Sequence, residues 1–138
     1  MGLDGEWYNQ LKSKMVLKVA GADVTGEYHT EVGNADGIYP LAGRTEVGGG
    51  LPQNVGWVVS WQNDKRWTPS VTSWSGQLHD VDGEETIVTT WLLTRETKPK
   101  DDWQSTLVGQ DVFRRASPGA APRLETRSKR ALAHPSES

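Results

Sequence analysis

The residue types that carry enzymatic chemistry are present here without the spacings that chemistry needs. The three histidines show no HExxH or other metal-ligand spacing, and the chain has no cysteine. No GxSxG or GxxxxGK[ST] motif occurs, and no lysine follows the glycines at 48–50. The carboxylate pairs 84–85 and 101–102 fall in predicted loops, where they are typical of solvated charge. The sequence therefore predicts no enzyme, no catalytic residue, no metal site and no cofactor.

The aromatic residues indicate binding instead. Seven tryptophans stand against one phenylalanine, and an indole buries a large surface while keeping an N–H that needs a partner. In the stretch TSWSGQL at 72–78, period-2 alternation puts Thr72, Trp74 and Gly76 on one face. A hydroxyl, an indole and a glycine fill a core poorly, but they can line a cavity.

The elements that would position these residues read as strands. Turn signals such as Asp82-Gly83 recur at short intervals, and the runs between them are rich in Val, Thr, Trp and Tyr. Eight strands are predicted, at 5–11, 14–20, 25–30, 37–45, 55–62, 70–79, 86–95 and 105–113. The fold class is all-β. An eight-stranded antiparallel up-and-down β-barrel is favoured because closure removes exposed edges, with an open sandwich as the alternative.

Alternation along these strands gathers one mixed aromatic and polar face. Such an interior would leave polar groups unsatisfied if it were dry, and an eight-stranded barrel has room for one small ligand. We therefore expect a ligand inside. The predicted inward residues are Trp7, Asn9, Leu11, Tyr28, Thr30, Trp57, Val59, Trp61, Ser70, Thr72, Trp74, Thr89, Trp91, Leu93, Gly109, Asp111 and Phe113.

The opposite face of the last two strands is also apolar. Val88, Thr90 and Leu92 lie on the outside of the seventh strand by the same alternation, and Val108 on the outside of the eighth. This face is aliphatic enough to form a subunit interface.

Charge divides the chain into two parts. Residues 1–113 carry nine Lys and Arg against sixteen Asp and Glu, a net −7, whereas 114–138 carry six against two, a net +4. An acidic body argues against nucleic-acid binding. The longest apolar run, GWVVSW, is too short to span a bilayer, so no membrane association is expected. We predict a barrel domain over 1–115 and a flexible basic tail over 116–138, with a short helix near 123–133 as an alternative.

Six segments together resemble the avidin/streptavidin family. They are GEWYNQLKS at 5–13, TGEYHTEVGNA at 25–35, GWVVSW at 56–61, SVTSWSGQ at 70–77, TTWLLT at 89–94 and WQSTLVGQD at 103–111. Their order and spacing match over most of 5–113. The resemblance implies an eight-stranded barrel that binds biotin without chemistry, usually as a homotetramer. It also implies a secreted protein, although no signal peptide is present in this chain.

The resemblance further implies a role for each residue of a biotin site. Asn9, Ser13 and Tyr28 match donors to the ureido oxygen. Asp111 and Thr30 match acceptors for its two N–H groups, and charge-assisted bonds of this kind are the stronger ones. Thr72 matches a hydroxyl near the ring sulfur. The aromatic walls of the site correspond to Trp61, Trp74 and Trp91, with Leu93 beside them. The contacts to the valerate carboxylate correspond to Ser70 and the backbone N–H of Asn34.

Two further features follow from the same resemblance. Segment 31–36, EVGNAD, matches a loop that closes over the ligand, and Val32 and Asn34 belong to its binding set. Trp103 matches an indole that one subunit donates to its neighbour's site.

Two other functions stay open. The same barrel could hold another small ligand or a peptide. Alternatively, the tryptophans could form an interaction module for carbohydrate or proline-rich peptide, which would require them on the surface.

Overall fold

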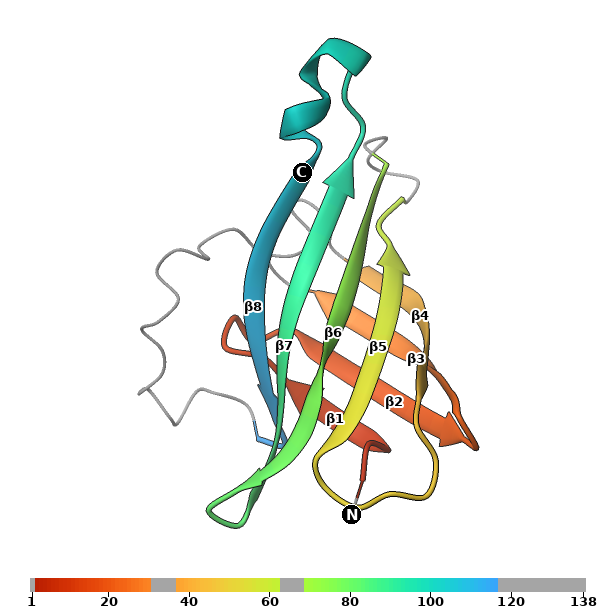
Figure 1. Cartoon of the computed structure of the whole chain (residues 1–138), viewed down its shortest axis with the longest axis vertical. Coiled ribbons are helices and arrows are strands. Elements are labelled where there is room, and N and C mark those ends of the chain that lie inside the picture. The colour runs from red at the N-terminus through yellow and green to blue at the C-terminus, as the bar shows by residue number, and fades with distance from the viewer. Residues whose placement is uncertain (1, 31–36, 63–68, 117–138) are drawn as a thin grey trace.

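The computed structural model describes residues 2–30, 37–62 and 69–116. Eight antiparallel strands form a closed barrel in sequence order, and β8 returns to β1 (Figure 1). The all-β barrel prediction is confirmed. The strands are β1 (Gly5–Tyr8), β2 (Lys14–Ala20), β3 (Asp23–Thr30), β4 (Gly37–Thr45), β5 (Gln53–Ser60), β6 (Ser70–Val81), β7 (Glu84–Arg95) and β8 (Thr106–Arg114), with the 3₁₀ helix η1 (Pro99–Gln104) between the last two.

Local sequence explains the tightest connections. Asp82 and Gly83 both have positive φ, 54° and 85°, as a two-residue type I′ hairpin requires, and they join the twelve-residue strands β6 and β7. Because successive strands run antiparallel, the connections after β1, β3, β5 and β7 lie at one end of the barrel. The mouth of any internal cavity is expected there.

The interior follows the predicted alternation. Trp57, Val59 and Trp61 of β5 are buried, as are Thr89, Trp91 and Leu93 of β7. Closure at the opposite end of the barrel involves Arg115, whose guanidinium lies 3.7 Å from the centre of the Trp7 ring and donates to Glu85 at 2.9 Å. Arg115 therefore covers the core at the end of the barrel opposite the expected mouth.

The predicted end of the first strand is wrong. The first strand ends at Tyr8 rather than at residue 11, because Asn9 begins a turn and Leu11 is only half-buried. The segment around Trp103 lies just before the eighth strand, which begins at Thr106. It forms η1, which begins at Pro99, a residue whose fixed φ suits the first helical position.

The outer surface of β7 and β8 carries exposed aliphatic side chains, as predicted, and Val58 on β5 adds to them. Val58, Leu92 and Val108 are 44%, 50% and 63% exposed, and Leu92 and Val108 are direct partners across β7 and β8. Val88, at 41%, extends the strip along β7. We call these four residues the outer strip.

Within the described part of the chain, no helix is long and apolar enough to cross a membrane. The tail predicted over 116–138 falls almost entirely outside the described residues, which end at Ala116.

Candidate functional site

A row of three tryptophans crosses the inside of the barrel. Trp57, Trp74 and Trp91 are direct partners on β5, β6 and β7. Gly43 and Gly109 flank the row on β4 and β8. A Cβ at Gly109 would lie 2.2 Å from the Trp91 ring, so only glycine leaves room for that indole. The Trp57 and Trp74 rings stack with their centres 5.6 Å apart, and Tyr28 stacks on Trp74 with ring centres 5.1 Å apart.

The turn after β1 presents a hydrogen-bond donor to the interior. The Asn9 Oδ1 atom accepts the backbone N–H groups of Leu11 and Ser13, both at 2.9 Å. This pattern fixes the orientation of the amide, because its oxygen is committed to the turn. Its Nδ2 group donates to the Tyr28 hydroxyl at 3.2 Å. Asn9 is therefore positioned to donate, as its predicted role requires.

Tyr28 and Ser13 complete this donor cluster. Both side chains are buried, and the two hydroxyls interact. Burial raises the pKa of the Tyr28 hydroxyl well above its ordinary value, and the charge of Asp111 raises it further. Tyr28 is therefore a neutral hydroxyl at physiological pH and keeps its proton for donation.

Asp111 on β8 is a buried acceptor beside this donor cluster. Its Oδ2 atom accepts from the Trp74 indole at 2.9 Å, and its Oδ1 atom accepts from Gln10 Nε2 at 2.9 Å. Burial raises the pKa of this carboxyl to about 6, although the Trp74 and Gln10 donors act in the opposite direction. Each carboxylate oxygen has two lone pairs, so one donor at each oxygen leaves room for a ligand N–H.

Other predicted side chains line the interior nearer the mouth. Thr30, Ser70, Thr72 and Leu93 are all buried, and Thr72 accepts the Trp61 N–H at 2.7 Å. The Ser70 hydroxyl and the Trp91 N–H have no hydrogen-bond partner among the described residues. The Trp91 N–H lowers the pKa of Asp111 without making a hydrogen bond of normal geometry. Buried polar groups without partners are costly, and a polar ligand would satisfy them.

Three further predicted site residues remain, namely Val32, Asn34 and Trp103. Val32 and Asn34 lie outside the described residues. Trp103 is 78% exposed on η1, so its indole is not buried in the interior of its own barrel.

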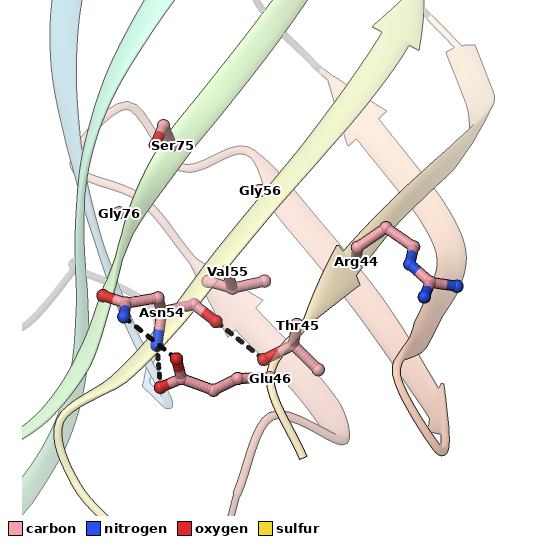
Figure 2. Close-up of a pocket in the computed structure, with 8 residues that line it drawn as sticks. All are labelled: Arg44, Thr45, Glu46, Asn54, Val55, Gly56, Ser75 and Gly76. Atoms are coloured by element: carbon pink, nitrogen blue, oxygen red, sulfur yellow. Dashed lines mark hydrogen bonds between the residues drawn. The ribbon is translucent and has the colours of Figure 1, made fainter.

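A hollow of about 390 Å³ on the outer surface of β4 to β6 was not predicted (Figure 2). Glu46 accepts from both the backbone and the side chain of Asn54 there, and the exposed residues Arg44 and Ser75 line it. The buried residues Thr45 and Val55 also line it, and none of the predicted site residues is among its described lining residues.

Sequence reasoning missed Gln10 as a partner of Asp111. The residue follows Asn9 in a turn, and no local pattern distinguishes it from a solvated glutamine. Among the described residues, no group of three His, Cys, Asp or Glu side chains could hold a metal ion.

The fold is a closed eight-stranded β-barrel whose interior carries buried hydrogen-bond donors, a buried carboxyl acceptor and aromatic side chains. The family model described as Avidin family matches residues 1–116, and the chain belongs to that family.

Among its relatives, afifavidin from Afifella pfennigii is 35% identical over 118 residues, covering 80% of this chain and 67% of that protein. Avidin from Gallus gallus is 31% identical over 121 residues, covering 82% and 77%. Fibropellin-1 from Strongylocentrotus purpuratus is 34% identical over 127 residues, covering 87% of this chain but only 11% of that protein. The matched barrel is therefore a small part of fibropellin-1.

Proposed function

We propose that this protein binds biotin inside the barrel and does no chemistry on it. The observation that carries the proposal is the placement of a donor cluster and a buried acceptor in one enclosed interior. Asn9 and Tyr28 supply donors of the kind a ureido oxygen needs, and Asp111 supplies an acceptor for a ureido N–H. The Trp61, Trp74 and Trp91 rings would contact the flat bicyclic system of the ligand.

The mouth is suited to the other end of the ligand. Ser70 is buried with an unsatisfied hydroxyl, so it can donate to the valerate carboxylate, and Asn34 is assigned the second contact on the family resemblance alone. Thr30 and Thr72 would serve the second N–H and the ring sulfur. Val32 and Leu93 would add apolar contact.

The burial of the tryptophans disfavours the alternative of a surface interaction module. Trp7, Trp57, Trp61, Trp74 and Trp91 are each at most 2% exposed. A carbohydrate or proline-rich peptide needs accessible rings, and of the described tryptophans only Trp103 offers one.

We further propose a homotetramer in which the outer strip is covered and Trp103 covers a neighbour's ligand. Exposed valine and leucine side chains on adjacent strands are typical of a subunit interface. The highly exposed Trp103 side chain would gain a buried environment only against another subunit. Secretion is proposed on the family resemblance alone.

Calorimetric titration tests the function directly. Protein unfolded, cleared of endogenous ligand and refolded is titrated with biotin, and separately with 2-imidazolidinone and with pentanoate. We expect tight binding of biotin and much weaker binding of its two halves, because the barrel encloses both ends. No heat with biotin from a folded barrel would contradict the proposal and favour a different small ligand.

A further inference from the structure

The seam between β1 and β8 closes the barrel with little backbone pairing. Among the described residues, the register of these two strands contains one pair, Tyr8 with Arg114. By contrast, β6 and β7 pair over their full twelve residues. The β1 backbone leaves the sheet at Asn9 to form its turn, and beyond that point the described residues of β8 are paired with β7 but not with β1.

Gln10 supplies by its side chain what the backbone no longer supplies. Continuing the register from Tyr8 and Arg114, position 10 falls opposite Val112. The Gln10 Oε1 atom accepts the Val112 N–H at 3.1 Å, and Nε2 donates to the Gln110 carbonyl at 3.2 Å. An antiparallel neighbour would make the same two kinds of bond to these groups. The side-chain amide therefore continues the ladder for one more step.

The same Nε2 group also reaches the ligand site. It donates to Asp111 Oδ1 at 2.9 Å, while Trp74 donates to Oδ2 at 2.9 Å. An amide nitrogen has two hydrogens, so both of its bonds can form together. The carboxylate is held at both oxygens by donors on two different elements, and its orientation is determined by them.

We infer that Gln10 is a positioning residue of the ligand site, whose side-chain amide extends the β1–β8 ladder and aims the Asp111 carboxylate into the barrel. Asn9 and Asp111 belong to the two sides of this seam. The Gln10 side chain thus links the turn that carries Asn9 to the strand that carries Asp111. The role toward a ligand rests on the proposed function, whereas the hold on Asp111 does not.

The surroundings of Asp111 make its titration a clean readout. Its partners Trp74, Gln10, Asn9 and Trp91 are uncharged, and Tyr28 on β3 is the titratable side chain that faces it. Tyr28 stays protonated throughout the acidic range, so a change in the pKa of Asp111 reports on the donors that bind its carboxylate.

Three variants distinguish a role of Gln10 in orienting the Asp111 carboxylate from a role only in closing the barrel between β1 and β8. Gln10→Met removes both roles. Gln10→Glu keeps an acceptor for the Val112 N–H but turns a carboxylate toward Asp111. Arg115→Met is the matched control, because Arg115 donates to the Asp4 and Glu6 carbonyls across the same seam and makes none of its hydrogen bonds to Asp111.

The pKa of Asp111 is measured by carboxyl ¹³C NMR in the ligand-free protein, with the melting temperature and the biotin dissociation constant in parallel. Gln10→Met should raise that pKa by about one pH unit, since a hydrogen bond to a charged group is lost, and should weaken biotin about tenfold. Gln10→Glu should raise it further while keeping one of the two ladder bonds, the one from the Val112 N–H. Arg115→Met should lower the melting temperature and leave the pKa in place.

An unchanged Asp111 pKa in both Gln10 variants would overturn the inference. Gln10 would then only hold β1 and β8 together, as Arg115 does. If Gln10→Met does not fold, Gln10→Glu decides the matter alone. A raised pKa in a barrel that binds no biotin would refute the proposed function and leave the positioning role standing.

Discussion

The two faces of β7 differ in what they are built to contact. On the inner face Trp91 and Leu93 are fully buried among aromatic and polar neighbours, and Asp111 lies beside Thr89 on the adjacent strand. On the outer face Val88 and Leu92 are about half exposed and purely aliphatic. One strand therefore carries directional polar recognition inward and non-directional apolar surface outward. A ligand is the expected partner of the first face, and a second copy of the chain is the expected partner of the other.

The largest effect is expected on the inner face, from Asp111→Ala. The change removes a charge-assisted acceptor and leaves a ligand N–H buried without a partner, so biotin binding should weaken by about 3 kcal/mol or more. Calorimetry measures it, and light scattering should show an unaltered assembly. Glu27→Ala, which removes an exposed carboxylate on the outer side of β3, serves as the control. An unchanged dissociation constant in folded Asp111→Ala would remove Asp111 from the site.

Trp103→Lys should weaken both biotin binding and assembly, because Trp103 is proposed to cover the ligand of a neighbouring subunit. Loss of an indole from a desolvated contact typically removes about 2–4 kcal/mol. Biotin should dissociate faster and the oligomer should loosen, and by linkage biotin should tighten assembly.

Off-rates and light scattering on the same Trp103 variant, with and without biotin, make the test. Dissociation at the wild-type rate would mean that each barrel binds its ligand alone.

Acidic substitutions in the outer strip should weaken assembly of the oligomer. Leu92→Glu with Val108→Glu places two carboxylates at a proposed apolar interface and should dissociate the oligomer, while the exposed positions keep the barrel folded. Size-exclusion chromatography with light scattering reports the mass. Val81→Glu alters an exposed valine at the far end of β6, outside the strip, and is the control. Equal masses for both proteins would contradict an interface at the outer strip.

Low pH should weaken biotin binding at the inner face and leave the apolar contacts of the outer strip unchanged. The pKa of Asp111 is raised to about 6 in the free protein, so the folded state holds this proton more tightly than the unfolded chain. Its contribution to stability is therefore present below the ordinary pKa and lost as pH rises through about 6. Ligand binding has the opposite preference, since a ligand N–H requires the carboxylate.

Biotin affinity should consequently fall by up to about tenfold for each pH unit below 6. Titrations between pH 5 and 7.5 measure the slope, and Asp111→Asn should abolish it. A flat wild-type profile would show that Asp111 does not titrate in the binding step.

The smallest effect is expected from removing the tail. Truncation after Arg115 keeps the guanidinium that covers Trp7 and donates to Glu85. The melting temperature and the biotin dissociation constant should stay within error of the full chain. A large loss in either would assign the tail to the barrel or to a neighbouring site.

Periodicity in the sequence was sufficient to predict eight strands and their inward and outward residues, because side-chain direction along a strand depends only on alternation. Family resemblance added the roles expected of Asn9, Tyr28 and Asp111. The boundary at Tyr8 and the 3₁₀ helix around Trp103 were not predicted, since strand ends depend on which neighbour continues to pair.

Contacts across the barrel were decided by tertiary structure alone. Gly109 faces the Trp91 ring only because β7 and β8 adopt one register, and a residue on one strand contains no information about that register. Gln10 reaches Asp111 across a hundred residues of sequence because the barrel closes at β1 and β8. The sequence by itself determined which side chains face inward. Closure of the sheet decided which of them meet, because distances between strands are set by the whole ring of pairings and by no single segment.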